Sequence, residues 1–352
     1  MDHTKPHPEL FTAPFATEEF NGMPYRPLGR SGLRVSNVGL GLWKIGYPET
    51  GDGARVDEKM SFQIFDKAIE TGVTFWDTAN RYNFGSGNSE RIIGKWLKAN
   101  PDQRRNVVIA TKICGGMDGF TPNHSHLSRL NIIESVRACM ARMQIEYIDV
   151  LYFHSPDPLS PPEESLATIE DLVGRDIIRY FAVSNFTTEL LATYQAAEKS
   201  LSCRCRVLAV QNQFDIVQGE TAANKGMLAY CARTGVSFVA YSPLARGLLT
   251  DRYLDAGKVG PGDRLFDEKA MDKVKDEAVM AKVKKLAALA REWGFELSQL
   301  ALAYMLALAG MGPVIPSASS PKQVESNAAA GKVKLSEEQK ARVKAVLEGE
   351  AK

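Results

Sequence analysis

Histidine and cysteine are scarce in this chain of 352 residues, which contains five of each. The cysteines form an odd set on a long chain without an export signal, a pattern that argues against a disulfide framework. Cys203 and Cys205 supply only half of a zinc site, because zinc needs further ligands at suitable spacing. We therefore expect free thiols and no metal. The cysteines are Cys114, Cys139, Cys203, Cys205 and Cys231.

The chain also lacks an excess of charge of either sign. Forty-three basic residues face forty-two acidic ones, which leaves a net charge of +1. So small a charge gives no electrostatic attraction for nucleic acid or for an anionic membrane surface. We expect neither as a partner.

Long apolar runs are missing as well. No uninterrupted apolar segment approaches the roughly 20 residues that a membrane-spanning helix requires. Residues 1–20 carry charges and prolines in place of the basic and apolar regions of an export signal. These features predict a soluble, cytoplasmic protein. Hydrophobic residues make up 44% of the sequence and charged residues 24%, so a sizeable core can form.

From about residue 36 onward, short β-branched runs alternate with longer amphipathic segments, a pattern typical of parallel strands joined by helices. Eight such units without a linker favour a closed (β/α)8 TIM barrel over a doubly wound sheet. A doubly wound fold would also need a Gly-x-Gly-x-x-Gly turn, and Gly39-Leu40-Gly41 is followed by Lys44 at the third position. The predicted strands cover residues 38–41, 73–77, 107–112, 148–154, 178–184, 207–211, 236–241 and 313–315. The predicted helices cover residues 57–71, 89–99, 131–143, 163–174, 187–199, 221–234, 281–309 and 320–330.

Several stretches fall outside this repeat. We interpret residues 1–24 as an N-terminal extension and a candidate for disorder, and residues 25–352 as one barrel domain. Within that domain, the pattern at 25–36 predicts a small hairpin that plugs the bottom of the barrel. The long loops 113–130 and 243–275 follow the third and seventh strands. They therefore belong to the face on which barrel enzymes bind substrates and cofactors.

Polar residues stand at the ends of three consecutive predicted strands. Asp77, Lys112 and His154 each end a strand, and Tyr82 lies five residues after Asp77. The carboxyl ends of barrel strands meet at one mouth, where polar side chains are typical of catalysis. Taken singly, each residue has an ordinary interpretation as a helix cap, a snorkelling lysine, a core histidine or a half-buried tyrosine. Together they make a coherent group for proton transfer.

The chemistry of this group follows from its charges. The Lys112 ammonium would lower the pKa of the Tyr82 hydroxyl, and Asp77 would keep that ammonium charged and oriented. Tyr82 would then act as general acid, a role worth roughly 10²- to 10⁴-fold in rate. His154 would donate a hydrogen bond to the substrate oxygen that becomes negative. These roles together predict the reduction of a carbonyl group by hydride.

Six short segments occur in a characteristic order over residues 25–330. They are LGRSGLRVS at 28–36, FWDTANRY at 75–82, GNSERIIG at 87–94, VIATK at 108–112, DVLYFH at 149–154 and VSNF at 183–186. With these segments the chain resembles the aldo-keto reductase family, in its bacterial and potassium-channel beta-subunit branches. The resemblance implies a (β/α)8 barrel that binds NADP(H) across its C-terminal face. It also implies hydride transfer to or from a carbonyl compound, with Asp77, Tyr82, Lys112 and His154 as the catalytic tetrad.

The resemblance further implies which residues hold the coenzyme. Ser184, Asn185 and Gln211 would bind the nicotinamide carboxamide, and Tyr241 would stack on the ring. The segment 242–249 would wrap the pyrophosphate, and the segment 315–327 would hold the adenine end. The full implied set is Gly41, Leu42, Trp43, Asp77, Ser184, Asn185, Gln211, Tyr241, Ser242, Pro243, Leu244, Arg246, Gly247, Arg252, Arg264, Ile315, Ser317, Ser319, Gln323 and Asn327.

The chain departs from the family pattern at the adenine end. Many relatives carry an arginine where this sequence has Ser319 and a glutamate where it has Ser326. Ser319 removes one charge-assisted contact to a 2′-phosphate, whereas Arg264 and Lys322 favour that phosphate. We expect NADP(H) to be preferred, with NAD(H) as the alternative.

Aromatic residues are candidates for the substrate site. Trp43, Phe84 and Phe120 would form apolar walls beside Tyr82 and His154, although each aromatic residue could equally be ordinary packing. The loop 113–130 also holds His124 and His126, which lack an evident carboxylate or thiolate partner. We therefore assign this pair to the shape of the pocket and not to a metal site. The expected partner is a small carbonyl or alcohol compound, and the sequence leaves the oligomeric state open.

Two other classes of function are compatible with these residues. A regulatory subunit resembling the channel beta subunits would combine nucleotide binding with docking on a partner, and a complete tetrad does not exclude it. A barrel hydrolase or lyase would need a metal cluster, a nucleophile with its base, or a Schiff-base lysine, for which Lys112 is the one candidate. The favoured function is an NADP(H)-dependent oxidoreductase acting on an aldehyde, ketone or sugar-like carbonyl.

Overall fold

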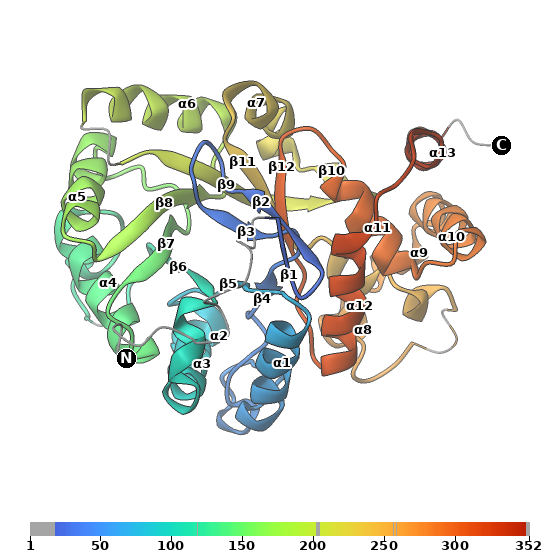
Figure 1. Cartoon of the computed structure of the whole chain (residues 1–352), viewed down its shortest axis with the longest axis horizontal. Helices are drawn as coiled ribbons and strands as arrows, with labels where there is room; N and C mark the ends of the chain where they lie inside the picture. The colour runs from blue at the N-terminus through green and yellow to red at the C-terminus, as the bar shows by residue number, and fades with distance from the viewer. Residues whose placement is uncertain (1–17, 118, 202–204, 256, 258, 350–352) are drawn as a thin grey trace, which may run out of the picture.

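Eight parallel strands close into a barrel in the computed structural model of the chain (Figure 1). The structure describes residues 18–349, except 118, 202–204, 256 and 258. The strands lie in the order β12-β11-β9-β8-β7-β6-β5-β4. Backbone hydrogen bonds from Gly39 N to Val314 O, at 2.8 Å, and from Gly41 N to Pro316 O, at 3.0 Å, join the two ends of this order. These bonds close the sheet, which confirms the predicted (β/α)8 fold.

Every predicted strand of the barrel is present, and the bounds differ by a few residues. The largest difference is in β9, which continues to Asp215 and pairs there with the short antiparallel β10. Most strand residues are buried, as expected for strands covered by helices outside and by packed side chains inside. The bounds are β4 Leu40–Gly41, β5 Phe75–Asp77, β6 Val108–Ile113, β7 Ile148–Phe153, β8 Ile178–Ser184, β9 Val207–Asp215, β10 Gly219–Glu220, β11 Ser237–Tyr241 and β12 Met311–Ile315.

Helices cover the outside of the barrel, and most lie close to the predicted ranges (Figure 1). The predicted helix at 281–309 is instead two helices, α10 and α11, because Gly294 between them adopts a left-handed φ of 75°. The last helix, α13, is not among the predicted ones. The bounds are α1 Glu58–Glu70, α2 Tyr82–Gly85, α3 Asn88–Ala99, α4 Arg129–Met143, α5 Pro162–Gly174, α6 Thr188–Ala197, α7 Met227–Thr234, α8 Arg264–Asp267, α9 Asp272–Lys275, α10 Glu277–Glu292, α11 Leu297–Leu306, α12 Pro321–Lys332 and α13 Glu337–Glu348.

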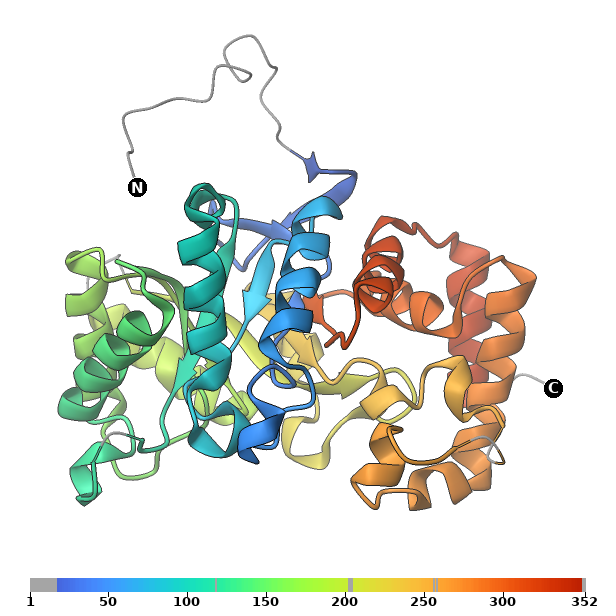
Figure 2. The same ribbon diagram turned by 90° about the horizontal axis from the view of Figure 1, so that it is seen from below.

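A small antiparallel sheet covers the N-terminal end of the barrel (Figure 2). Leu28 and Val35 are fully buried there and pack with the side chains that fill the barrel interior. The predicted plug is therefore confirmed. It has one more strand than expected, because Asn21 and Gly22 form a tight turn with φ angles of 50° and 72°. Residues 1–17 of the predicted extension lie outside the described residues. The strands are β1 Glu19–Phe20, β2 Met23–Pro27 and β3 Arg34–Ser36.

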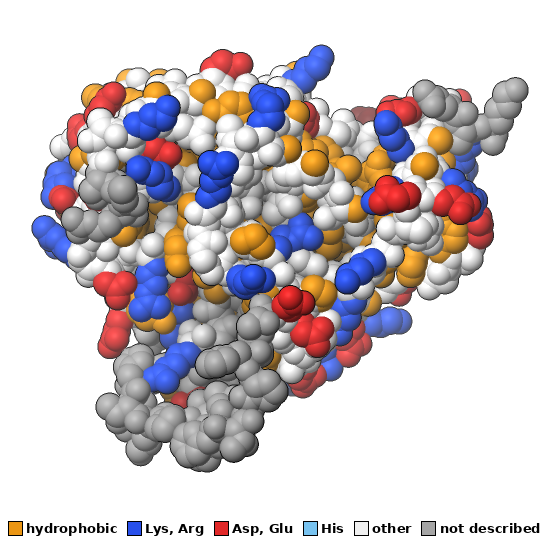
Figure 3. Space-filling model, turned by 45° about the horizontal axis from the view of Figure 1, so that its top comes forward, with side chains coloured by type: hydrophobic (Ala, Val, Ile, Leu, Met, Phe, Trp, Pro, Cys, Tyr) orange, Lys and Arg blue, Asp and Glu red, His pale blue; other side chains and the backbone are white. Residues whose placement is uncertain are grey.

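The molecular surface carries charges of both signs. Figure 3 shows acidic and basic side chains interspersed over the face that it displays. In the part of the chain that the structure describes, none of the helices is long and apolar enough to cross a membrane. The cysteines at 114, 139, 205 and 231 carry free, buried thiols, and Cys203 lies outside the described residues.

Candidate active site

The C-terminal mouth of the barrel brings together the four residues expected to be catalytic. Asp77 is the last residue of β5, Lys112 is the last but one of β6, and His154 follows the end of β7 by one residue. Lys112 and His154 therefore do not end their strands as predicted, although all three residues lie at the same mouth. Tyr82 begins α2, a short irregular turn that directly follows β5 and returns the phenol to this mouth.

Hydrogen bonds hold three of these side chains together. Lys112 Nζ donates to Asp77 Oδ1 at 2.5 Å, to Tyr82 Oη at 2.7 Å and to the Thr78 carbonyl oxygen at 2.8 Å. The Tyr82 hydroxyl donates to Asp77 Oδ1 at 3.2 Å. Asp77 and Lys112 are each 1% exposed, so their ion pair is withdrawn from water. The His154 ring lies edge-on to the Tyr82 ring, with 5.9 Å between centroids.

Burial shifts the pKa values of these groups. It raises the pKa of Tyr82 well above the ordinary value, with the negative charge of Asp77 as the second cause. The net shift is therefore opposite to the lower pKa expected from the Lys112 ammonium alone, because burial and the Asp77 carboxylate favour the neutral phenol. Burial also lowers the pKa of Lys112, against the opposing effect of Asp77. It lowers the pKa of His154 to about 3, helped by the charges of Lys112 and Arg81, so the imidazole is neutral at physiological pH.

A polar network connects this group to two residues expected around the nicotinamide. Gln211 Nε2 donates to Asp77 Oδ2 at 2.8 Å, so both carboxylate oxygens of Asp77 have partners. Ser184 ends β8, and its hydroxyl donates to the Gln211 carbonyl oxygen at 2.8 Å. The network fixes the Gln211 side chain next to the Asp77–Lys112 pair.

Asn185 and Tyr241 extend the polar mouth. Asn185 Nδ2 donates to the His154 carbonyl oxygen at 2.8 Å, and Asn185 Oδ1 accepts from the Tyr241 hydroxyl at 2.9 Å. Tyr241 is the last residue of β11 and is partly exposed. Amide groups and an aromatic ring thus lie beside the tetrad, and such a set can bind a carboxamide and a flat ring.

Five cationic side chains gather in the loops after β4 and β11. Arg264 and Arg246 both bind Glu268, at 2.7 and 3.1 Å, and carboxylates also face the other arginines. Burial, together with Arg264 and Arg55, lowers the pKa of Lys44 to about 8. Lys44 and Arg55 are not among the predicted residues, although Lys44 directly follows the predicted Trp43. The excess of cations favours a ligand with several negative charges. The cations are Lys44, Arg55, Arg246, Arg252 and Arg264, and the carboxylates are Asp263, Asp267 and Glu268.

The backbone of the segment 242–249 is strained. Ser242, Ala245 and Arg246 have left-handed φ angles of 55°, 49° and 59°, and Gly247 follows with 100°. Such conformations are costly for residues with a side chain and cluster at functional sites. Turns of this kind also direct backbone N–H groups into concavities that bind anions. The segment that the family resemblance assigns to the pyrophosphate therefore has a backbone suited to that ligand.

The segment expected at the adenine end lies beside the predicted residues 41–43. Gly41 forms a parallel bridge with Ser317, and a Cβ atom at Gly41 would approach Ser317 Oγ to 3.0 Å. Ser319 donates from N and Oγ to Gln323 Oε1, at 2.8 and 3.0 Å. Residues 41–43 and the segment 315–327, both implied in coenzyme binding, thus lie side by side although they are distant in the sequence.

Exposed aromatic side chains lie around the mouth. Trp43 is 41% exposed, and the Arg264 guanidinium lies over its ring, 4.7 Å from the centroid. Phe84 and Phe120 are 85% and 109% exposed. Phe84 lies against Gly53, where any side chain would collide with the phenyl ring. Trp43 therefore belongs to the cation cluster, whereas Phe84 and Phe120 stand on the loops after β5 and β6.

The two histidines of the loop after β6 both contact carboxylates. His126 Nδ1 lies 3.1 Å from Asp157 Oδ1, and His124 Nε2 lies 3.7 Å from Glu134 Oε2. These partners are not evident in the sequence, because they come from later segments of the chain. Within residues 18–349 as described, no group of three or more potential metal ligands comes together.

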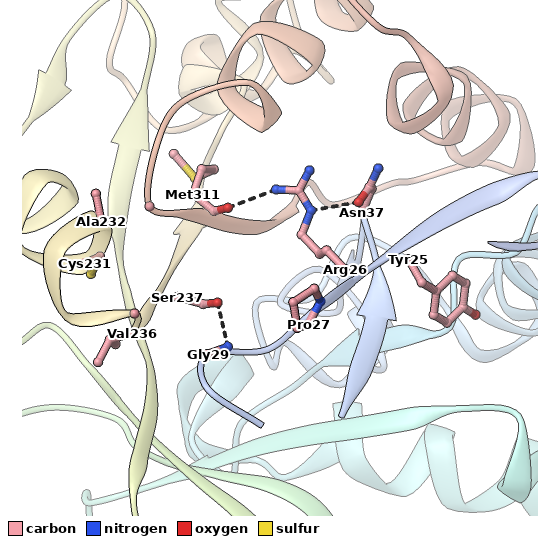
Figure 4. A pocket seen from close by; sticks show the side chains of 12 residues that line it. Tyr25, Arg26, Pro27, Gly29, Asn37, Cys231, Ala232, Val236, Ser237 and Met311 are labelled. Atoms are coloured by element: carbon pink, nitrogen blue, oxygen red, sulfur yellow. Dashed lines mark hydrogen bonds between the residues drawn. The ribbon is translucent and has the colours of Figure 1, made fainter. Parts of the chain in front are cut away.

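A cavity of about 400 Å³ lies at the opposite end of the barrel (Figure 4). Its polar groups are bound to the protein: Arg26 donates to the carbonyl oxygens of Met311 and Gly312 at 2.9 Å, and Ser237 Oγ accepts from Gly29 N at 2.8 Å. These contacts fix the hairpin plug to the ends of β11 and β12. The residues that line the cavity therefore anchor the hairpin plug. The residues expected to be catalytic lie at the other end of the barrel.

The fold and this mouth define a class of protein, the (β/α)8 barrels with a buried Asp–Lys pair beside a tyrosine and a neutral histidine. A model described as the aldo/keto reductase family matches residues 37–348, and the chain belongs to that family. The chain is 37% identical over 248 residues to aldo-keto reductase AFTS1 and 36% identical over 248 residues to aldo-keto reductase AMT2, both of Alternaria alternata. Each match covers 64% of this chain and 66% of the relative, just under two thirds of the relative's length.

Proposed function

We propose that the protein is an oxidoreductase that transfers hydride between NADP(H) and a carbonyl or alcohol substrate. The observation that carries this proposal is the contact of the Tyr82 hydroxyl with Lys112 Nζ, at 2.7 Å, beside the buried Asp77. A nicotinamide coenzyme, when bound, supplies or takes up the hydride. The residues of the chain orient the substrate and move the proton.

Tyr82 is the proposed general acid. A tyrosine is protonated at neutral pH and burial favours the same state, so a proton is available for a carbonyl oxygen that becomes negative. Lys112 already donates a hydrogen bond to the phenol oxygen, and this bond stabilises the phenolate that the transfer leaves behind. Asp77 holds Lys112 in place. In the direction of alcohol oxidation, the same phenolate removes the proton from the alcohol.

His154 is the proposed second donor to the substrate oxygen. Because the pKa is lowered to about 3, the ring is neutral and has one N–H to donate. The edge-on contact places the His154 ring beside Tyr82, so both side chains lie where a carbonyl group would bind. A donor placed in advance at the developing charge stabilises the transition state without reorganisation of water.

The residues present fit NADP(H). The Gln211 and Asn185 amides and the Tyr241 ring suit the nicotinamide. The cation cluster suits the phosphates, because its five cations face three carboxylates. We propose NADP(H) over NAD(H) on this excess of charge, with Arg264 as a contact for the 2′-phosphate.

The test is turnover in both directions. Purified protein is mixed with NADPH and a panel of aldehydes, ketones and sugars, and the loss of NADPH absorbance is followed; NADP⁺ is then combined with the matching alcohols. Turnover of at least one pair supports the proposal. Coenzyme binding without any turnover in either direction would leave a nucleotide-binding protein and remove the assignment of the tetrad.

A further inference from the structure

Arg81 is a cation at the substrate mouth that the proposed chemistry does not use. It directly precedes Tyr82 and is exposed to solvent. Its charge contributes to the lowered pKa of His154, so its field reaches the point at which the carbonyl would be held. A substrate group bound by Arg81 would therefore lie close to the carbonyl that is reduced.

Within the residues that the structure covers, the guanidinium donates a hydrogen bond to one partner, and that partner is neutral. Arg81 Nη1 donates to the Gly116 carbonyl oxygen at 2.8 Å. Among the residues that the structure describes, no carboxylate forms an ion pair with Arg81. The guanidinium therefore keeps N–H groups that can bind a further acceptor.

Two carboxylates near this mouth, in the described part of the chain, are engaged elsewhere. Asp77 is bound to Lys112 and to Gln211. Asp157 accepts from His126 Nδ1 at 3.1 Å and from the Leu127 backbone N–H at 2.8 Å. The positive charge of Arg81 is thus left without compensation from these carboxylates.

Glycines give the Arg81 side chain its place. A Cβ atom at Gly115 would lie 2.2 Å from Arg81 Cδ, so a side chain there would displace Arg81 from its present position. The guanidinium therefore lies beside the first residues of the loop after β6, which begins at the barrel mouth. A guanidinium can bind both oxygens of a carboxylate or a phosphate in one plane.

We propose that Arg81 binds an anionic oxygen group of the substrate, so that the protein selects carbonyl compounds that carry a carboxylate or phosphate. This inference rests on the proposed carbonyl reduction and names its substrate class. Tyr82 and His154 address the carbonyl oxygen, and Arg81 fixes the other end of the molecule.

The experiment compares pairs of substrates in which one member carries an anionic group and the other does not. We would measure kcat/KM with NADPH for meta- and para-carboxybenzaldehyde and for their methyl esters, and for glyceraldehyde with and without its phosphate. The expected result is a preference of about tenfold for an acid over its ester, a modest value because Arg81 is exposed and water screens its charge. This preference should fall with added salt and be expressed mainly in KM.

Two variants sharpen the result. Arg81→Met keeps the length of the side chain and should lower the ratio of kcat/KM between acid and ester by about tenfold, whereas Arg81→Lys should retain part of it. Arg30→Met, an exposed arginine at the other end of the barrel, is the matched control and should leave the ratio unchanged.

The outcomes separate the two proposals. Equal use of acid and ester by the native protein, or an equal loss of both in Arg81→Met, would overturn the role of Arg81 and leave carbonyl reduction standing. A preference for the phosphate alone would assign the site to phosphorylated carbonyl compounds. The absence of turnover with every neutral and charged aldehyde would overturn the proposed function and this inference with it.

Discussion

Replacement of Tyr82 by phenylalanine isolates the proton that the mechanism needs. The substitution removes one hydroxyl, which donates to Asp77 Oδ1 at 3.2 Å and accepts from Lys112 Nζ at 2.7 Å. The Lys112 ammonium keeps two of its acceptors, Asp77 and the Thr78 carbonyl oxygen. One unpaired N–H costs about 1–3 kcal/mol of folding free energy, so the variant should fold.

The loss in rate should be larger than the loss in stability. General acid catalysis is worth about 10²- to 10⁴-fold, which corresponds to about 3–5 kcal/mol of activation free energy. We therefore expect Tyr82→Phe to reduce kcat for carbonyl reduction by at least a hundredfold. Coenzyme affinity should stay nearly constant, because the hydroxyl belongs to the group expected to bind the carbonyl oxygen.

Single-turnover NADPH oxidation and a fluorescence titration of NADPH measure these two quantities separately. Tyr152→Phe is the matched control, because it removes a hydroxyl from a fully buried tyrosine of β7 inside the barrel. That control should lose less than tenfold. If Tyr82→Phe keeps a tenth or more of the native kcat, the proton comes from another group and the assignment of Tyr82 is wrong.

Three further predictions concern the charged groups around the mouth. Lys112→Met leaves Asp77 buried and without its cation. Urea unfolding should therefore show a free energy of unfolding that is lower by about 3–5 kcal/mol. A smaller decrease would mean that water reaches the carboxylate. NADPH affinity should fall as pH rises through about 8, because Lys44 then loses its positive charge, and fluorescence titrations of Lys44→Met should lack this pH dependence. Arg264→Ala should weaken NADPH about tenfold more than NADH in the same titration; equal losses would assign Arg264 to packing on Trp43.

The barrel itself could be predicted from the sequence, because each of its strands and most of its helices leave a local pattern. The break between α10 and α11 was predictable in principle, since Gly294 is visible in the sequence. The same holds for β1, because Asn21-Gly22 is a strong hairpin signal within residues that we interpreted as an extension. These errors arise where a composition-based interpretation outweighed a specific turn signal.

The candidate site was predictable in its residues and less so in its contacts. The positions of Asp77, Lys112 and His154 follow from strand ends that meet at one mouth. The Glu268 bridge between Arg246 and Arg264 and the position of Lys44 depend on how the loop after β11 folds back over the loop after β4. Sequence spacing holds no information on such contacts between loops.

The direction of the Tyr82 pKa shift shows the same limit in energetic terms. Weighing charges alone, a lysine beside a phenol predicts a lower pKa, and the 2.7 Å contact with Lys112 exists. In the structure, Asp77 and Lys112 are both 1% exposed, so the carboxylate balances the positive charge of Lys112. Burial also removes water from the phenol. Desolvation and the negative charge of Asp77 then outweigh the ammonium and favour the neutral phenol. A raised pKa makes the phenol a weaker acid, but the alkoxide that develops on the substrate is a still stronger base and can take the proton. The Lys112 hydrogen bond is already present and strengthens as the phenolate forms.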